Sequence, residues 1–151
     1  MNEEARARAL RLLEKRDYSR KMLLDKLTEK GAPEEAAAAV VDRLCELGLV
    51  DDARFAALVA RHYAAKGYGL RRIREELYRR GIDRELWDDA LAELPQTDDP
   101  VSRRFAQKLR GTPGKADDIR RAQSFLLRRG YSWEEIRSAA ERYQAENEEN
   151  E

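Results

Sequence analysis

Three glycines divide the chain at nearly constant intervals, and this spacing constrains the fold more than any other feature. Gly31, Gly81 and Gly130 each follow a basic residue, and they lie 50 and 49 residues apart. A glycine after a basic helix end is typical of the position that closes an α-helix in a left-handed conformation. Recurrence at a period of this length is typical of tandem repeat proteins. The spacing therefore predicts three copies of one helical unit.

Apolar residues recur at matching offsets around each of these glycines. Pairs four residues apart precede them, and a second apolar set follows them, which indicates one buried face on each of two helices. The residues are Leu23 and Leu27, then Val40, Val41 and Leu44; Ile73 and Leu77, then Ala90, Leu91 and Leu94; and Ala122 and Leu126, then Ala139, Ala140 and Tyr143.

A further helix is predicted ahead of these two in each copy, over residues 3–16, 52–66 and 101–110. Helix-start signals support the scheme: Ser132 and Glu135 have the spacing of a capping box, and Pro100 suits a first helical position. The composition also favours helices, because the chain has 22 Ala and 18 Leu. Val, Ile and Thr together number only 12, which is too few for a sheet.

We therefore predict an all-α protein of three tandem three-helix repeats in an elongated, curved array. The repeats should span residues 1–50, 51–97 and 98–145, with the likeliest hinge at 95–100. Residues 146–151 form an acidic tail, and we expect the chain to fray after Tyr143.

Charge is balanced in sum but sorted along the chain. The 30 basic and 30 acidic residues cancel, yet residues 52–81 hold eight basic and three acidic residues, and residues 101–130 hold nine and two. Residues 83–99 and 134–151 hold seven acidic residues each, against one and two basic residues. The first two helices of the second and third repeats are thus basic. Stacked in register, they would form a basic stripe suited to a polyanionic or mixed-charge partner.

The candidate binding residues are the arginines of this stripe. The alternative for any one of them is a merely solvated charge on an exposed helix face, but recurrence in two repeats favours the binding stripe. Tyr68, Tyr78 and Tyr131 flank them and could stack on bases or on a protein surface. The candidates are Arg71, Arg72, Arg74, Arg79, Arg80, Arg103, Arg104, Arg120, Arg121, Arg128 and Arg129.

Catalytic and metal-binding functions are disfavoured. The only cysteine, Cys45, and the only histidine, His62, lie on the predicted apolar faces of their helices, so we expect a buried thiol and a core or boundary histidine. Acidic doublets could in principle hold a metal for phosphoryl transfer, but most lie at predicted helix starts, where capping explains them. We expect no enzyme activity, no metal and no cofactor. The doublets are residues 51–52, 88–89, 98–99 and 117–118.

The cellular setting follows from what the sequence lacks. The N-terminus is charged from residue 3, and no window approaches the ~18 apolar residues of a membrane span. A single cysteine cannot form an internal disulfide, which fits a reducing compartment. We expect a cytoplasmic protein with no membrane partner, and a monomer.

Four segments together resemble the RecX family of bacterial recombination regulators. They are Gly48–Ala56, Gly69–Ile82, Phe125–Ile136, and Tyr18-Ser19-Arg20-Lys21 ahead of Gly31. The resemblance covers roughly residues 5–143. Two departures from the family pattern are Met22, at a position that is usually acidic, and an N-terminal extension that is nearly absent.

The resemblance implies a non-enzymatic regulator that binds the RecA recombinase, chiefly as its filament on single-stranded DNA, and lies in the filament groove. Such a regulator restrains filament growth, ATP hydrolysis, strand exchange and coprotease activity, and so acts in DNA repair, recombination and the SOS response. Contact with DNA is also associated with the family. From the residues alone, a free-standing nucleic-acid-binding helical module is the alternative.

Overall fold

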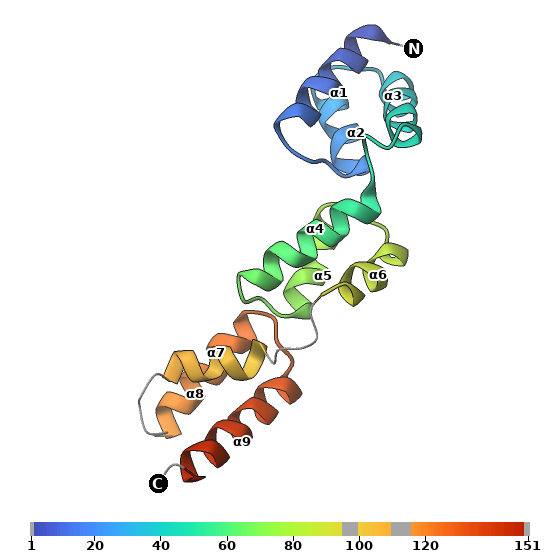
Figure 1. The fold of residues 1–151 in the computed structure, drawn as a ribbon. Coiled ribbons are helices and arrows are strands. Elements are labelled where there is room, and N and C mark those ends of the chain that lie inside the picture. Colours follow the sequence, from blue (N-terminus) through green and yellow to red (C-terminus); the bar gives the residue numbers. More distant parts are fainter. Residues whose placement is uncertain (1, 95–99, 110–115, 150–151) are drawn as a thin grey trace. The chain divides into compact units, whose positions relative to one another are not determined.

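A computed structural model describes residues 2–94, 100–109 and 116–149, and it contains helices and no strand within these ranges. The all-α repeat fold is therefore confirmed (Figure 1). Of the predicted hinge at 95–100, residues 95–99 lie outside the described residues, and Pro100 begins a helix. The helices are α1 Glu3–Lys15, α2 Arg20–Glu29, α3 Glu34–Glu46, α4 Asp52–Ala65, α5 Leu70–Arg79, the 3₁₀ turn η1 Arg84–Leu86, α6 Trp87–Ala92, α7 Pro100–Leu109, α8 Ala116–Arg128 and α9 Trp133–Glu149.

The chain divides into two compact units whose boundaries fall inside helices. Unit 1 contains residues 1–59 and 76–93, and unit 2 contains residues 60–75 and 94–151. Unit 1 therefore includes α1 to α3, the start of α4, the end of α5, and α6. Unit 2 includes the end of α4, the start of α5, and α7 to α9.

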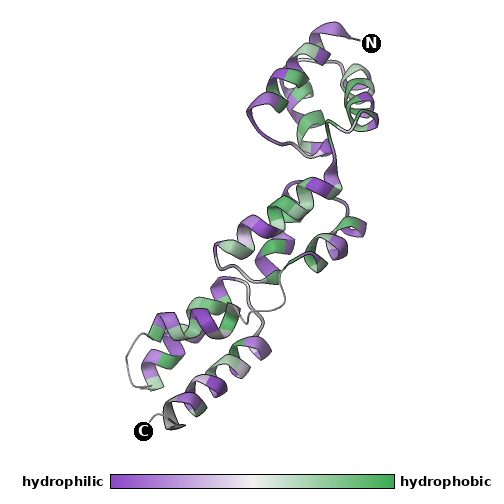
Figure 2. Ribbon diagram, in the orientation of Figure 1, coloured by the Kyte–Doolittle hydropathy of each residue, from purple (hydrophilic) through white to green (hydrophobic). Residues whose placement is uncertain are grey.

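The core of unit 1 lies where α1, α2 and α3 pack on one another. Figure 2 shows hydrophobic residues, in green, on each of these three helices. Leu23 and Leu27 of α2 are fully buried there, as the four-residue spacing predicts. Ala5 and Ala9 on α1 are also buried, and their small side chains let α1 approach closely. Val40, Val41 and Leu44 complete the core from α3.

The core of unit 2 is built in the same way from α7, α8 and α9. Phe105 of α7 is fully buried, and its ring meets Tyr143 of α9 edge-on with the ring centroids 5.6 Å apart. Ala122 and Leu126 of α8 and Ile136 of α9 are buried against it. The stripe positions predicted from the sequence are thus the residues that form both cores.

The predicted helix ends are confirmed at the three repeat glycines. Gly31, Gly81 and Gly130 have φ angles of +99°, +69° and +96°, the left-handed conformation that glycine adopts without a Cβ clash. After each, the next residue's N–H donates to a carbonyl in the last helical turn, as from Ala32 to Leu27 at 3.0 Å. The capping box also forms, because Ser132 and Glu135 exchange side-chain to backbone hydrogen bonds of 3.1 Å.

One expectation about helix length is wrong. Helix α9 continues to Glu149, so the chain does not fray after Tyr143. The third helix of the second repeat is short, because the 3₁₀ turn η1 precedes a six-residue α6. The side chain of Trp87 at this change donates its indole N–H to the carbonyl of Ile82, 3.0 Å away, which fixes the entry into α6.

In unit 2 the second and third repeats meet end to end through two helices. The N–H of Gly69, just before α5, donates to the carbonyl of Arg129 at 2.8 Å, and the N–H of Arg71 donates to the carbonyl of Gly130 at 3.1 Å. The free N–H groups at the start of α5 thereby satisfy free carbonyls at the end of α8. A Cβ on Gly69 would lie 2.5 Å from the Gly130 backbone, so no side chain fits there.

In unit 1 the equivalent positions of the first and second repeats meet in the same way. Ser19 is buried, caps α2 by accepting from the N–H of Met22 at 3.1 Å, and donates its hydroxyl to the carbonyl of Arg80. The N–H of Arg20 donates to Asp52 Oδ1 at 2.8 Å. Burial raises the pKa of Asp52, and the hydrogen bond from Arg20 partly offsets this effect. The second helices of neighbouring repeats are therefore joined by one recurrent contact.

Candidate partner-binding surface

Aromatic rings and cations interleave in unit 2 beside the contact between α5 and α8. The guanidinium of Arg129 lies 4.4 Å from the ring centre of Tyr68, and that of Arg72 lies 4.8 Å from it. Lys108 of α7 lies over Phe125 of α8, with Nζ 4.4 Å from the ring centre. We call these five residues the cation–aromatic cluster. Such contacts contribute about 0.5–2 kcal/mol each, so the cluster stabilises this part of unit 2.

Two arginines of unit 2 donate hydrogen bonds to main-chain carbonyls at the C-terminal end of α4. Arg104 Nη2 donates to the carbonyl of Ala65 and Arg129 Nη1 donates to the carbonyl of Lys66, each at 3.3 Å. The buried Nε of Arg104 has no hydrogen-bond partner among the described residues. Arg104 and Arg129 are therefore held against the fold rather than extended into solvent. Burial in the same region raises the pKa of Tyr131.

Arg79 and Arg80 belong to unit 1 and serve a different role. Both approach Glu76, whose side chain is only 5% exposed, with nitrogen–oxygen distances of 3.1 Å and 2.5 Å. Arg80 also donates to the main-chain carbonyl of Glu76 at 3.0 Å. These two arginines neutralise a buried carboxylate next to the point where Ser19 contacts the Arg80 carbonyl.

The remaining candidates are exposed side chains of unit 2, apart from Arg72 in the cluster. Arg71 donates to the carbonyl of Leu127 at 2.6 Å, which brings the first turn of α5 to the last turn of α8. Arg120 and Arg121 approach Asp117 and Asp118 of their own helix at 2.6 Å and 4.0 Å. Arg103 is also exposed.

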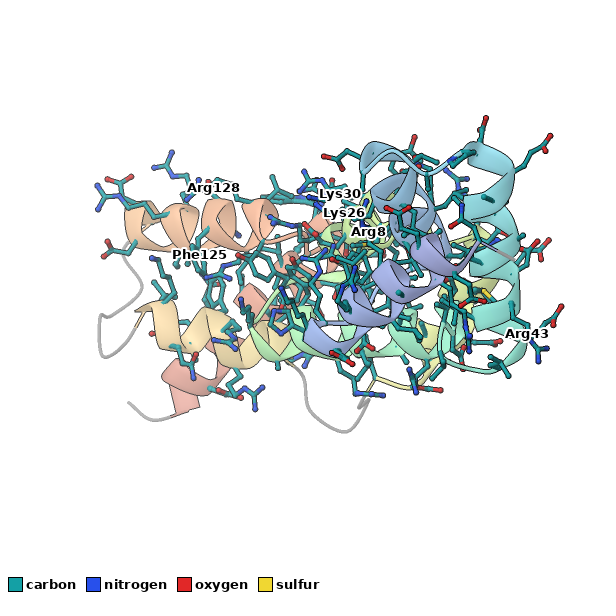
Figure 3. All side chains as sticks on the ribbon, turned by 90° about the horizontal axis from the view of Figure 1, so that it is seen from above. Arg8, Lys26, Lys30, Arg43, Phe125 and Arg128 are labelled. Carbon is teal, nitrogen blue, oxygen red and sulfur yellow. The ribbon has the colours of Figure 1, made fainter. Side chains whose placement is uncertain are left out.

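Arg74 and Arg128 are the most available cations of the predicted set. Both are exposed, and neither forms a hydrogen bond or ion pair with any residue in the described ranges. Figure 3 shows Arg128 pointing away from α8, whereas Phe125 points toward α7. Two leucines are also exposed: Leu70, the first residue of α5, at 40%, and Leu127, next to Arg128 in the last turn of α8, at 38%. We call Leu70, Arg74, Leu127 and Arg128 the exposed arginine–leucine surface.

The structure thus brings together nine of the eleven predicted arginines in unit 2 and places Arg79 and Arg80 in unit 1. Sequence reasoning missed Lys108 and Phe125, whose spacing fits an ordinary helix face. Their contact joins two helices of the third repeat, so no local pattern could have paired them. Tyr68 lies between Gly67 and Gly69. These glycines are the one local signal in the sequence that two stretches of backbone come close together there.

Two predictions about single residues are wrong. His62 is exposed and meets Tyr63 edge-on, with ring centroids 5.2 Å apart, so it is no core or boundary residue. The buried face of α4 includes Ala56, Val59 and Ala60, and His62 lies to one side of it. Cys45 is only half-buried, and its Sγ lies 3.7 Å from Arg20 Nη1.

Two further features are absent from the described residues. No group of three or more His, Cys, Asp or Glu side chains is placed to hold a metal ion. None of the described helices is both long and apolar enough to cross a membrane.

The tandem three-helix repeats, joined by the recurrent contact between their second helices, define a helical-repeat protein. Two family models match the chain: the first three-helix domain of RecX over residues 5–44 and the second over residues 51–91. The chain belongs to the RecX family.

Relatives and solved structures agree with this assignment. The chain is 42% identical to the regulatory protein RecX of Xanthomonas axonopodis pv. citri, covering 87% of this chain and 83% of that protein. It is 40% identical to the RecX of Stenotrophomonas maltophilia, with 87% and 82% covered. The crystal structure of RecX from Lactobacillus salivarius superimposes with a TM-score of 0.80 at 20% identity, covering 92% and 94% of the two chains. At that identity the structural match shows the fold.

Proposed function

We propose that this protein is a non-enzymatic regulator that binds the RecA recombinase, and its filaments on single-stranded DNA, and mainly inhibits them. Membership of a family of regulatory proteins over most of the chain supports a regulatory role. Recombinase, ATPase and coprotease activities are the ones that the family resemblance assigns as targets. In this proposal the protein changes these activities by binding to the filament, and none of its side chains takes part in a chemical reaction.

One observation carries the proposal at the level of residues: the exposed arginine–leucine surface. Arg74 and Arg128 present charge that no described carboxylate neutralises, and Leu70 and Leu127 add apolar area beside them. Arginine with apolar neighbours is enriched at protein interfaces, and its charge attracts an acidic surface or DNA backbone. Arg71, Arg103, Arg120 and Arg121 surround this surface as secondary contacts. Arg72, Arg79, Arg80, Arg104 and Arg129 act by holding the fold.

The first prediction tests the regulatory role directly. Added at less than one molecule per recombinase, the protein should lower the steady-state ATPase rate of RecA filaments on single-stranded DNA. The measurement is a titration of ATP hydrolysis with folded protein, using heat-denatured protein as the control. An unchanged rate across the titration would reject inhibition.

The alternative function is a free-standing nucleic-acid-binding module, and the number of exposed arginines in unit 2 favours it as the second candidate. Affinity for bare single strands would then fall with salt, with a log–log slope of about −0.7 per phosphate contact. If the protein inhibits filaments but does not bind bare DNA at low salt, the nucleic-acid-binding alternative is rejected and the regulatory function is retained.

A further inference from the structure

The large apolar side chains that are exposed among the described residues of unit 2 gather around one contact. They are Leu70, Leu127 and Trp133, the last with 47% of its surface exposed. Leu70 directly precedes Arg71, whose side chain donates to the carbonyl of Leu127 at 2.6 Å. Trp133 begins α9 three residues after Gly130, whose carbonyl accepts from the N–H of Arg71 at 3.1 Å. Single exposed leucines are ordinary, whereas apolar side chains gathered at one contact indicate an interaction site.

Trp133 differs from the other tryptophan of the chain in its contacts. Trp87, in unit 1, donates its indole N–H to the carbonyl of Ile82 at 3.0 Å, and the guanidinium of Arg84 lies 5.5 Å from its ring centre. The indole of Trp133 forms no hydrogen bond and meets no cation or second ring in the part of the chain that the structure describes. Its exposed ring and its N–H donor are therefore both free to contact a partner.

The other two repeats show that the fold does not need an indole at this position. At the offsets of 50 and 49 residues, Trp133 corresponds to Glu34 and Arg84. These residues begin α3 and η1, and both are exposed. A charged residue thus begins the third helix in two repeats, and tryptophan begins it in the third. The reason for the indole therefore lies outside the packing of the helices.

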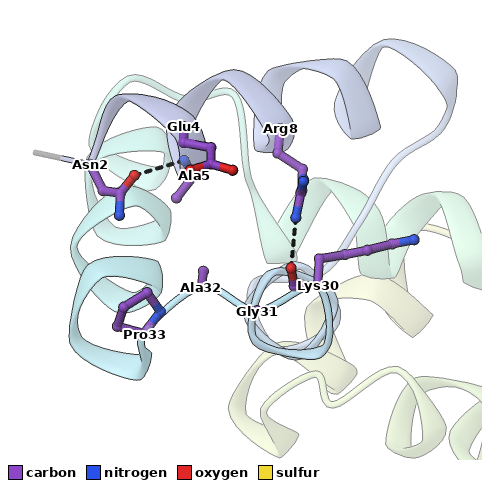
Figure 4. A pocket seen from close by; sticks show the side chains of 8 residues that line it. All are labelled: Asn2, Glu4, Ala5, Arg8, Lys30, Gly31, Ala32 and Pro33. Carbon is purple, nitrogen blue, oxygen red and sulfur yellow. Dashed lines mark hydrogen bonds between the residues drawn. The ribbon is translucent and has the colours of Figure 1, made fainter.

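The first repeat also lacks an apolar cluster where its second helix ends. A pocket of about 80 Å³ lies there, and the described residues of its lining include Asn2, Glu4, Arg8 and Lys30 but no aromatic ring and no leucine (Figure 4). Arg8 Nη1 donates to the carbonyl of Lys30 at 2.8 Å, as the dashed line shows. The apolar side chains around the end of α8 are therefore not a general property of these helix ends.

The charges around Trp133 favour a protein over a nucleic acid as the partner. Arg74 and Arg128 form no ion pair with a described carboxylate, but the exposed Glu75 and Glu134 directly follow Arg74 and Trp133 in the sequence. Carboxylates repel the phosphates of a DNA backbone, whereas a protein surface can offer carboxylates to the arginines and cations to the glutamates. Tryptophan and arginine are also enriched among the residues that dominate protein–protein binding.

We propose that Trp133 is the apolar anchor of the exposed arginine–leucine surface and inserts into an apolar pocket of the partner protein. Groups of both charges surround that pocket, with carboxylates facing Arg74 and Arg128. Leu70 and Leu127 pack around the inserted ring and exclude water from it. The inference rests on the proposed function in taking the recombinase as the partner. It assigns the contact to the recombinase protein rather than to the DNA in its filament.

The test removes the indole and measures binding to protein and to DNA separately. Trp133→Ala deletes the ring, and Trp133→Glu deletes it while giving α9 the acidic first residue that begins α3. Tyr78→Ala is the matched control, because Tyr78 is an exposed aromatic residue in the part of α5 that belongs to unit 1. Affinities are measured for RecA without DNA, for RecA filaments on single-stranded DNA and for bare single strands. Circular dichroism measures the helicity of each variant.

We expect both Trp133 variants to weaken binding to RecA, with and without DNA, at least about tenfold. Trp133→Ala should leave binding to bare single strands within about twofold of the wild type, and Tyr78→Ala should leave all three affinities within the same range.

Three results would overturn the anchor and leave the regulator in place. One is wild-type affinity for RecA in both Trp133 variants, and another is equal weakening by Tyr78→Ala. The third is a loss confined to bare strands and filaments, because the ring would then stack on DNA bases. If the wild type binds RecA in neither form, the proposed function itself fails, and the anchor proposal fails with it.

Discussion

Replacing Gly130 by alanine should lower the free energy of unfolding by about 2–5 kcal/mol, whereas the same change at Gly31 should cost about 1–2 kcal/mol. The two glycines have nearly equal φ angles, +96° and +99°, so the left-handed conformation costs an alanine about 1–2 kcal/mol at either. Only at Gly130 would the new Cβ meet a backbone atom, at 2.6 Å, and relieving such overpacking costs about 1–3 kcal/mol more.

Urea unfolding followed by circular dichroism measures both variants. The comparison isolates the contact between α5 and α8, because backbone strain is common to the pair. Equal losses at the two glycines would show that this contact contributes nothing to stability, and the end-to-end joining of repeats in unit 2 would have to be abandoned.

Replacing Glu76 by alanine should lower the free energy of unfolding by about 2–4 kcal/mol. Removing one partner of a fully buried ion pair costs about 3–5 kcal/mol. The expected loss of unfolding free energy is smaller here because the side chains of Arg80 and Arg79 are 26% and 65% exposed and remain hydrated. The loss also frees Arg80, whose carbonyl accepts from Ser19 at the contact between the first two repeats.

The neighbouring Glu75→Ala is the control, because Glu75 is exposed on the same helix and its loss should change stability by no more than about 0.5 kcal/mol. Glu76→Gln keeps an acceptor for Arg80 and should fall between the two. Denaturant titration of the three variants provides the comparison. Finding Glu76→Ala as stable as Glu75→Ala would contradict a structural role for this ion pair.

The helices could be predicted because their signals are local. Leu23 and Leu27 lie on one face through the helix period alone, and Gly31 marks the end of the same helix. Recurrence at two further positions turned a weak pattern into a repeat. The short α6 escaped prediction because its start depends on how Trp87 reaches the carbonyl of Ile82.

The roles of the arginines could be predicted only in part, because a long charged side chain can reach partners far away in the sequence. Arg80 and Glu76 are four residues apart, and their pairing could be expected from spacing. Arg71 reaches the carbonyl of Leu127, 56 residues away, and Arg129 lies over Tyr68. Neither contact follows from local pattern, so charge counts alone could not separate binding arginines from structural ones.

The measurement that tests the functional account most directly compares two double variants for binding to RecA filaments on single-stranded DNA. Arg74→Gln with Arg128→Gln removes the exposed charge of the arginine–leucine surface. Arg43→Gln with Arg137→Gln removes the same charge from two exposed arginines on α3 and α9. The account predicts at least about tenfold weaker binding for the first pair, about 1.4 kcal/mol, and less than about twofold for the second. Equal affinities for the two double variants would contradict it.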